Sequence, residues 1–223
     1  MKYYTRGGWW FPDEEEHLIA YMENTMMRRH DRFSYQFSKY ERAKKYVKQR
    51  RCAIDIGAHV GLWTYPMSFD FQKVIAFEPS PKHRECWVKN VKAINASLYP
   101  YALGTVSKDA FLITPLKQHT GNTMISTISG EGVAVQIRTL DSFEFKGPVD
   151  FIKIDCEGYE QAILQGAEKS LLAWKPTIVV EQRGDGDFTT QFGFPRTGAV
   201  DYLVSLGAVV REDLSHDFVL TWK

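Results

Sequence analysis

Short apolar runs alternate with segments of helical periodicity from residue 51 onward. Four runs, at residues 52–55, 74–78, 149–155 and 177–181, consist largely of β-branched and other apolar residues, as in parallel strands that are buried on both faces. Pro81 can begin a helix after the second run. Apolar stripes at helical spacing are formed by Trp87, Val88, Val91 and Ile94 and by Ile163, Ala167, Leu171 and Trp174. This alternation predicts an α/β fold with a doubly wound, mostly parallel sheet of about seven strands.

Two further segments depart from this rhythm. Residues 109–114 and 133–140 have the pattern of additional strands, and a polar loop at residues 117–132 separates them. Such an insertion is long enough to cover a cleft. At the end of the sequence, residues 208–210 and 217–222 predict a hairpin with His216 exposed in its turn. We therefore expect an inserted β segment and a C-terminal antiparallel hairpin.

The first fifty residues predict a helical extension ahead of a domain at residues 51–223. Acidic residues 13–16 follow Pro12, and basic residues 28–30 come near the expected last turn, as the helix dipole favours. A second, basic helix is expected at residues 36–50. The nearby aromatic residues could stack on a ring or form a dimer contact, but packing across the domain is the simpler interpretation. These residues are Tyr3, Tyr4, Trp9, Trp10 and Phe11.

Composition narrows the function only a little. The 223 residues carry a net charge of +1, with 44% hydrophobic and 25% charged residues, which gives no reason to expect binding to nucleic acid or an anionic membrane. The sequence shows no signal peptide and no apolar stretch of the roughly 18 residues that a membrane span needs. Cys52, Cys86 and Cys156 have no paired spacing, which argues against disulfides and zinc. We expect a cytoplasmic protein with no membrane partner, and its oligomeric state stays open.

Each of the four buried strands ends in a carboxylate, namely that of Asp55, Glu78, Asp155 or Glu181. Ligands of open α/β sheets bind outside the carboxyl ends of the strands, so these acids would line one crevice. The first strand runs into Asp55-Ile56-Gly57-Ala58-His59-Val60-Gly61, where Gly57 permits a tight turn and Gly61 lets the next helix pack closely. His59 stands where a dinucleotide-binding turn has its second glycine. That departure favours S-adenosylmethionine, which has no pyrophosphate, over NAD.

Glu78 strengthens the prediction of a cofactor site. It follows Gly57 by about 20 positions, the interval at which an acid accepts the hydroxyls of a ribose. Alternatively, it could cap the helix that begins near Pro81. The glycine turn favours the ribose role.

The chain resembles the FkbM-like family of class I S-adenosylmethionine-dependent methyltransferases over roughly residues 53–182. The resemblance rests on the glycine turn and on Phe77-Glu78-Pro79, Thr139-Leu140-Asp141, Ile152-Lys153-Ile154-Asp155-Cys156-Glu157-Gly158-Tyr159-Glu160, Leu164-Gln165-Gly166-Ala167 and Val179-Val180-Glu181. It implies a Rossmann-like domain that moves a methyl group from S-adenosylmethionine to a hydroxyl oxygen of a small molecule or glycan, with S-adenosylhomocysteine as product. His59 stands where the family pattern has Asn. The implied cofactor-binding residues are Asp55, Gly57, Ala58, His59, Gly61, Glu78, Pro79, Tyr101, Ala102 and Asp155.

Methyl transfer to oxygen needs an acceptor held in line and usually a base that removes its proton. Asp155 is the first candidate, as base or as the acid that faces the sulfonium, and Glu157 and Glu181 follow. Glu157 could instead cap the helix that opens at Tyr159. His119, in the inserted loop, could reach the acceptor, although a solvated histidine is the simpler interpretation.

Other observations bear on the charges around these acids. Asp155, Glu157 and Glu181 could together hold Mg²⁺, which prefers carboxylates. A divalent metal is therefore possible, but nothing in the sequence is diagnostic of one, and we predict no metal site. Lys153 is unusual in a buried strand and is expected to pair with a neighbouring acid.

Three alternatives compete with a small-molecule methyltransferase. An oxidoreductase that binds NAD could use the same fold. An RNA methyltransferase or RNA-binding module could use the basic residues of the second helix for phosphate contacts, although the balanced total charge makes nucleic acid an unlikely partner. A domain that binds cofactor without catalysis is the third. The basic residues are Lys39, Arg42, Lys44, Lys45, Lys48, Arg50 and Arg51.

Overall fold

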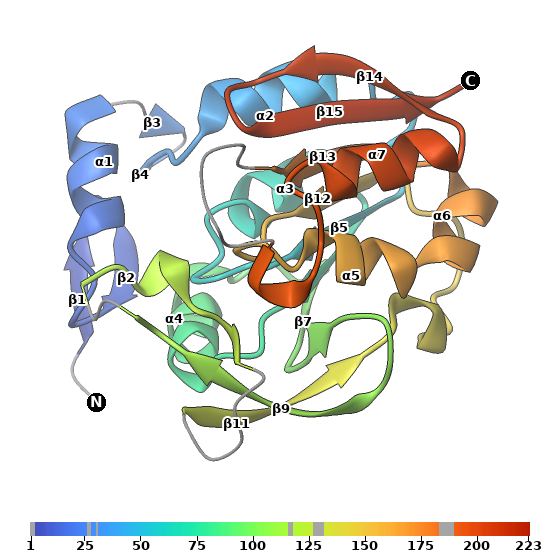
Figure 1. The fold of residues 1–223 in the computed structure, drawn as a ribbon. Helices are drawn as coiled ribbons and strands as arrows, with labels where there is room; N and C mark the ends of the chain where they lie inside the picture. The colour runs from blue at the N-terminus through green and yellow to red at the C-terminus, as the bar shows by residue number, and fades with distance from the viewer. Residues whose placement is uncertain (1–2, 26–27, 30, 116–117, 127–131, 183–189) are drawn as a thin grey trace.

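A seven-stranded sheet forms the centre of the molecule (Figure 1). The structure is a computed structural model that describes residues 3–25, 28–29, 31–115, 118–126, 132–182 and 190–223. The strand order is β14-β15-β13-β12-β5-β6-β7. These strands are β5 (Cys52–Ile56), β6 (Lys73–Phe77), β7 (Ala96–Tyr99), β12 (Phe151–Ile154), β13 (Thr177–Glu181), β14 (Ala208–Asp213) and β15 (Asp217–Trp222).

The sheet is parallel from β13 to β7, and the hairpin β14–β15 adds to β13 in the antiparallel direction. This confirms the predicted doubly wound sheet with a C-terminal hairpin. The parallel strands all end at one edge of the sheet, so the residues that follow them meet there. His216 lies exposed in the hairpin turn, as predicted.

Alternate residues of the central strands face two separate cores. Ile54, Ile152 and Ile178 face a core covered by α5 (Glu160–Gln165), α6 (Glu168–Trp174) and α7 (Gly198–Ser205). Ala53 and Phe151 face the other core, covered by α2 (Phe37–Lys44) and α3 (Thr64–Asp70). Burial on both faces explains why the strands read as continuous apolar runs rather than as alternating ones.

The predicted β insertion is a second sheet with the strand order β10-β9-β11-β8. Its strands are β8 (Ala102–Leu103), β9 (Lys108–Ile113), β10 (Met124–Ser126) and β11 (Val133–Arg138). The buried residues Ala110, Leu112, Ile125 and Ile137 join the core under α5 and α6. In Figure 1 this sheet lies below the central sheet. The 3₁₀ helix η1 (Thr120–Asn122) connects β9 to β10.

The N-terminal residues do not form the all-helical extension that we expected. The chain begins with a hairpin of β1 (Tyr3–Arg6) and β2 (Trp9–Pro12), and a pair of two-residue strands, β3 (Arg28–Arg29) and β4 (Arg32–Phe33), follows α1 (His17–Thr25). The first turn of α1 has no acid and its last turn no base. Helix α2 ends at Lys44, several residues before the expected end. The pairing of β1 with β2 satisfies backbone hydrogen-bonding groups of residues 3–12. The charges that suggested a helix dipole carry no information about such pairing.

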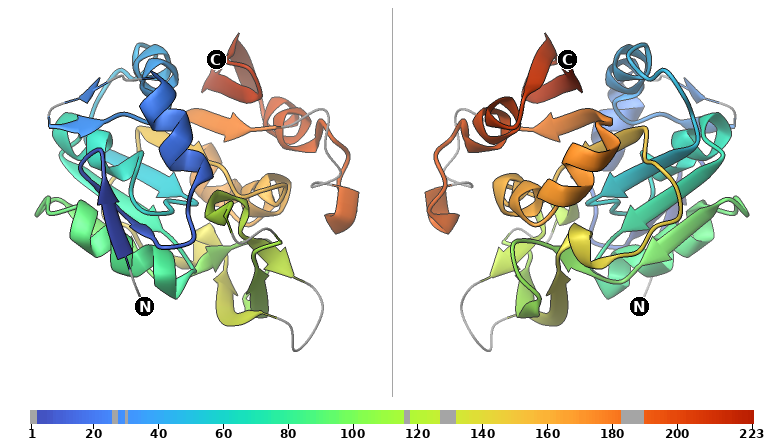
Figure 2. Two further views of the ribbon diagram at one scale, coloured as in Figure 1. Left: turned by 90° about the vertical axis from the view of Figure 1, so that its left-hand side faces the viewer. Right: turned by 90° about the vertical axis from the view of Figure 1, so that its right-hand side faces the viewer.

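Trp9 and Phe11, two of the aromatic N-terminal residues, pack against the domain, as the simpler interpretation predicted. Trp9 and Phe11 are 1% and 0% exposed, and they share a core with Val60 and Cys86 of the domain. The two views in Figure 2 show the hairpin and α1 lying along one side of the central sheet. The N-terminal residues are therefore packed onto the domain rather than set apart from it.

Two predicted helices differ from the structure in detail. In α4 (Pro81–Asn90), Trp87 is buried, as is Val91 just beyond it, but Val88 and Ile94 are 55% and 105% exposed, so the predicted apolar stripe is wrong in half of its members. The second stripe is divided between α5 and α6 at Gly166. A Cβ at Gly166 would lie 1.9 Å from the carbonyl oxygen of Gly104, so the close approach of these backbones explains the break.

Helix α3 begins late, at Thr64, which places Pro66 in its first turn, where a missing backbone N–H costs little. Among the residues that the structure describes, no helix has the length and apolarity needed to cross a membrane.

Candidate active site

The turn after β5 lies at the centre of the candidate site, and its residues Gly57 and His59 line both of the clefts described below. Gly57 adopts φ +78°, and a Cβ there would lie 2.0 Å from the carbonyl oxygen of Asp155, so only glycine fits against the end of β12. The backbone N–H groups of Gly57 and Ala58 both donate to the carbonyl oxygen of Phe77, at 3.1 and 3.0 Å. Gly61 has φ +97°. A Cβ at this position would lie only 2.7 Å from the side chain of Val91, which follows α4, so a glycine permits the close packing that the sequence predicted.

Glu78 follows β6 and lies 5% exposed beside this turn. Its Oε2 accepts a hydrogen bond from the backbone N–H of His59 at 2.8 Å, and its Oε1 accepts one from the backbone N–H of Ser80 at 2.8 Å. The Nδ1 atom of His83 lies 3.3 Å from Oε1. The capping alternative is not what the geometry shows, because Ser80 is the N-cap of α4 and accepts from the backbone N–H of His83.

Lys153 forms a buried ion-pair network under the turn, as the sequence predicted. Its Nζ lies 3.3 Å from Oδ2 of Asp155 and 3.9 Å from Oδ1 of Asp55, and it donates to the carbonyl oxygen of Gly57 at 3.3 Å. Although burial disfavours the ammonium, the negative charges of Asp155 and Asp55 raise the pKa of Lys153 above its ordinary value. Lys153 therefore stays positively charged beneath the carboxylates.

Asp55 is fully buried, and burial raises its pKa although Lys153 opposes the shift. Its Oδ2 accepts a hydrogen bond from the hydroxyl of Thr64 at 2.6 Å. Asp55 lines neither of the clefts described below, and its contacts are with Lys153 and with Thr64 of α3.

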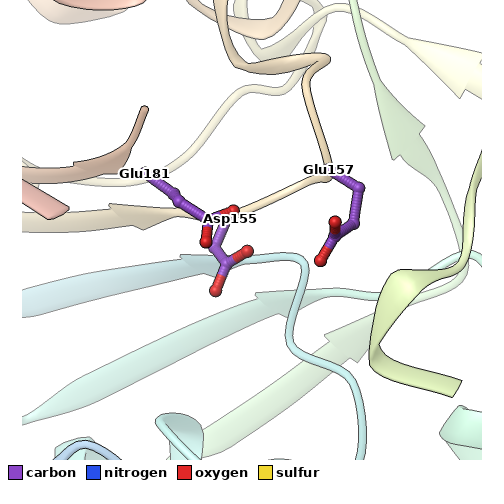
Figure 3. Close-up of side chains that lie close together, drawn as sticks. All are labelled: Asp155, Glu157 and Glu181. Carbon is purple, nitrogen blue, oxygen red and sulfur yellow. The ribbon is translucent and has the colours of Figure 1, made fainter. Parts of the chain in front are cut away.

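Three carboxylates gather where β12 and β13 end (Figure 3). Oxygen atoms of Asp155, Glu157 and Glu181 all lie within 4.8 Å of one another. Asp217 of β15 lies opposite Glu181 in the sheet, and burial raises the pKa of Asp217. Such a set can share protons or bind a divalent cation through oxygen. The prediction that no metal binds here stays a prediction.

Two clefts meet at this point. The first encloses about 590 Å³ and the second about 610 Å³, each partly open to solvent. Both are bordered by Gly57, His59, Gly121, Asp155 and Glu157. The other residues of the first cleft include Ile56, Phe77, Glu78, Pro79, His83, Tyr101, Ala102, Leu103, Tyr159 and Ile163, and those of the second include His17, Tyr35, Ala58, Trp63, Asn122 and Lys153.

The structure places most of the predicted cofactor-binding residues at these two clefts. Pro79, Tyr101 and Ala102 line the first cleft with Glu78, whereas Ala58 lines the second. Gly61 borders neither cleft. Of the predicted catalytic residues, Asp155 and Glu157 border both clefts.

The remaining two predicted catalytic residues lie outside both clefts. Glu181 adjoins Asp155 without lining either cleft. His119 also lines neither, and its ring stacks on that of His17 with centroids 4.7 Å apart. A direct catalytic role for His119 is therefore not supported by its position.

Glu160, not Glu157, supplies the carboxylate at the start of α5. Its Oε1 accepts hydrogen bonds from the backbone N–H groups of Cys156 at 2.7 Å and Gly158 at 3.2 Å. Burial raises the pKa of Glu160 to about 7. Glu157, with φ +53°, is instead 7% exposed and borders both clefts, so the capping interpretation of Glu157 is wrong.

Most of the basic residues around α2 are held in ion pairs. Arg42 contacts Glu212 at 2.5 Å, and Lys44 contacts Asp70 at 3.1 Å. Lys39 pairs with Asp217, Arg51 with Asp150, and Arg50 lies 3.8 Å from Asp70. These contacts compete with phosphate binding, so the structure weakens the case for an RNA-binding helix.

Sequence reasoning missed the residues that bring the N-terminal segment to the site. His17 and Tyr35 line the second cleft, and Glu15 holds Thr120 next to His59. These side chains belong to loops or to a helix end. The position of this segment depends on long-range contacts such as that between Glu15 and Thr120, which are 105 residues apart along the chain. Glu15 lies two residues before His17, the first residue of α1, and in the sequence it was only one of four consecutive acidic residues.

The sequence matches the methyltransferase FkbM domain family over residues 55–218, and the chain belongs to this family. It is a family of S-adenosylmethionine-dependent methyltransferases, which confirms the resemblance inferred from the motifs. Membership in it disfavours an NAD-dependent oxidoreductase. A search of curated proteins finds no match to the sequence.

Solved structures share the fold at low sequence identity. A methyltransferase FkbM from Methylobacillus flagellatus has a TM-score of 0.50 and 15% identity; the match covers 78% of this chain and 44% of that one. A putative O-methyltransferase from Klebsiella pneumoniae has a TM-score of 0.54 at 11% identity, with coverages of 95% and 90%. A putative methyltransferase from Streptococcus mutans, solved in complex with S-adenosylhomocysteine, has a TM-score of 0.51 at 12% identity, with coverages of 87% and 97%. These likenesses confirm the Rossmann-like fold.

Proposed function

We propose that this protein transfers the methyl group of S-adenosylmethionine to a hydroxyl oxygen of a small molecule or glycan. The observation that carries the proposal is the meeting of two clefts at Asp155 and Glu157, with Glu78 lining the first cleft only. A nucleoside held at Glu78 would have its reacting end at the junction. Two carboxylates border that junction and can accept a proton from a hydroxyl in the second cleft.

The first cleft fits the adenosine part of the methyl donor. Ile56, Phe77, Leu103 and Ile163 offer apolar surface for a purine, and Glu78 offers carboxylate oxygens for the ribose hydroxyls. We therefore assign the donor to this cleft and the acceptor to the second.

The reaction needs little covalent chemistry from the protein. When bound, S-adenosylmethionine supplies an electrophilic methyl carbon on a positively charged sulfur. Asp155 or Glu157 would remove the proton of the acceptor hydroxyl while its oxygen bonds to the methyl carbon and the carbon–sulfur bond breaks. A positioned base of this kind accelerates a reaction by about 10²–10⁴-fold. In the second cleft, Tyr35 and Trp63 with the polar side chain of Asn122 suit a hydroxylated ring.

Calorimetric titration with S-adenosylhomocysteine and, separately, with NAD tests the donor assignment. Binding of S-adenosylhomocysteine alone is expected, and binding of NAD alone would overturn the proposal. Transfer of a labelled methyl group to a panel of hydroxylated, amine and thiol acceptors then tests the choice of oxygen. Methylation confined to amines would refute it.

Asp155→Asn tests the base. The amide keeps the size of the side chain but cannot take the proton, so turnover should fall by at least about 10²-fold while S-adenosylhomocysteine still binds. Asp201→Asn, an exposed change of the same kind on α7, is the matched control. A fully active Asp155→Asn variant would remove Asp155 from the catalytic role.

A further inference from the structure

Glu15 is a buried carboxylate that joins two distant parts of the chain. It is 0% exposed, and its Oε1 accepts a hydrogen bond from the backbone N–H of Leu18 at 2.7 Å. Its Oε2 accepts from the backbone N–H of Thr120 at 2.8 Å and from the Thr120 hydroxyl at 2.5 Å. A buried carboxylate is costly unless donors surround it, and these three donors meet that need.

The Thr120 hydroxyl passes this contact on to His59. Because a carboxylate only accepts, the hydroxyl proton points to Glu15, and the oxygen of Thr120 is left to accept from Nε2 of His59 at 3.1 Å. This arrangement places the ring proton of His59 on Nε2. Burial lowers the pKa of His59 well below its ordinary value, which agrees with a neutral ring held in one tautomer.

His59 in turn contacts the residue assigned to the ribose. Its backbone N–H donates to Oε2 of Glu78 at 2.8 Å, and it holds φ +50° in the turn that borders both clefts. Its ring lies against that of His83, with centroids 4.0 Å apart. Hydrogen bonds therefore connect Glu15 through Thr120 to the ring of His59, and the backbone N–H of the same histidine connects it to Glu78.

The same N-terminal residues hold the rest of the loop around η1. The backbone N–H of Glu16 donates to the carbonyl oxygen of Gln118 at 3.1 Å, and His17 stacks on His119. We call residues 15–18 together with residues 118–121 the clasp. Gly121 of the clasp borders both clefts, and His17 and Leu18 border the second, so the clasp forms part of the cleft walls. Residues 15–18 lie outside the part of the chain that matches the family.

We propose that Glu15 is a positioning residue for the methyl-donor site: through Thr120 it fixes the ring of His59 and, with it, the turn that holds Glu78. The inference rests on the proposed function, since the donor site is the one assigned to S-adenosylmethionine. The N-terminal segment thus completes a site whose catalytic and ribose-binding residues all come from the family domain.

We call the contacts from Glu15 through Thr120 to the ring of His59 the relay. Thr120→Val and Thr120→Ser in the 223-residue protein test the relay with the least disturbance of the structure. Valine removes the hydroxyl and keeps the backbone contact with Glu15, whereas serine keeps both. In calorimetry with S-adenosylhomocysteine, Thr120→Val should raise the dissociation constant at least about fivefold, the usual effect of one lost hydrogen bond. Thr120→Ser should leave the dissociation constant nearly unchanged. Glu15→Ala should weaken binding further, because it releases both contacts of Thr120.

A spectroscopic measurement separates positioning from general support of the fold. Long-range ¹H–¹⁵N correlation spectra report which ring nitrogen of a histidine carries the proton. The signal of His59, assigned by its loss in His59→Gln, should indicate the Nε2–H tautomer in the wild type and in Thr120→Ser. In Thr120→Val it should change to a mixture of tautomers or to the other tautomer.

Glu14→Gln is the matched control, because Glu14 precedes Glu15 but forms an ion pair with Lys82 at 2.6 Å outside the clasp. It should leave both the dissociation constant and the His59 signal unchanged. Should Glu15→Ala fail to fold in a thermal melt, the two Thr120 variants decide the question. Wild-type binding and an unchanged His59 signal in Thr120→Val would overturn the proposal.

A failure of the proposed function is distinguishable from a failure of the relay. If the wild type does not bind S-adenosylhomocysteine, the proposed function fails and the donor-site role of Glu15 fails with it. The response of the His59 signal to Thr120→Val would still show whether the relay exists.

Discussion

Replacement of Glu78 by alanine is the most direct test of the donor site. The carboxylate is 5% exposed and already accepts hydrogen bonds from the backbone N–H groups of His59 and Ser80. Two carboxylate oxygens offer about four acceptor positions, and the two backbone N–H groups and Nδ1 of His83, 3.3 Å from Oε1, use three of them. One ribose hydroxyl can take the remaining position, and the second can replace His83. The substitution removes these acceptor positions and also releases the turn at His59.

The size of the effect follows from the charge and burial of the group. A hydrogen bond to a charged partner contributes about 1.5–3 kcal/mol, so two ribose hydroxyls would lose roughly 3–6 kcal/mol. At about 1.4 kcal/mol per factor of ten, the dissociation constant for S-adenosylhomocysteine should rise about 10²–10⁴-fold.

Calorimetry with deoxyribose analogues isolates the ribose contact from indirect effects on the turn. The wild type should bind the 2′-deoxy or 3′-deoxy form of S-adenosylhomocysteine at least about tenfold more weakly than the parent compound. In Glu78→Ala this penalty should disappear, because the acceptor is gone. Glu85→Ala, an exposed change of the same kind on α4, is the control. Wild-type affinity in Glu78→Ala, or a deoxy penalty that survives the substitution, would refute the ribose assignment.

Three further outcomes follow from the electrostatics. Burial raises the folded-state pKa of Glu160 from its ordinary value of 4.5 to about 7. The free energy of unfolding should therefore fall as pH rises from about 4.5 to 7, by at most roughly 3 kcal/mol. In denaturation experiments across this range, Glu160→Gln should lack this pH dependence. Dialysis against EDTA should leave methyl transfer intact, because Lys153 already places a cation 3.3 Å from Asp155; restoration by Mg²⁺ of a lost rate would contradict this. Lys45→Glu with Lys48→Glu should not change RNA binding in a filter assay at low salt, and a large loss would revive the RNA alternative.

The central sheet was predictable because its physics is local. A strand buried on both faces needs a continuous apolar run, and each of the four central runs became a strand. The carboxyl ends of parallel strands share one edge, so the approach of Asp155 to Glu181 followed from strand type alone. Gly57 was identifiable for the same reason, since the tight turn after β5 leaves no room for a Cβ.

What the sequence could not indicate depends on long-range contacts. The acidic run before α1 suggested a helix dipole, but Glu15 in that run bonds to Thr120, 105 residues away. Ile94 fitted a helical stripe, yet α4 ends at Asn90 and leaves this side chain in solvent; Val88, which lies within α4, is exposed as well. Periodicity identifies a face only while the helix lasts, and helix ends are set by tertiary packing.

Lys153 is a charged residue in β12, a strand whose other residues are apolar and buried. A lysine in a strand buried on both faces loses hydration, and such a residue persists only when charge compensates that loss. Here the compensation comes from Asp155 and Asp55, both within 4 Å. The lysine therefore allows several carboxylates to collect at one sheet edge without forcing all of them to take up protons. One of the carboxylates so maintained, that of Asp155, is the one proposed to accept the proton, so the charge of Lys153 supports the proposed base.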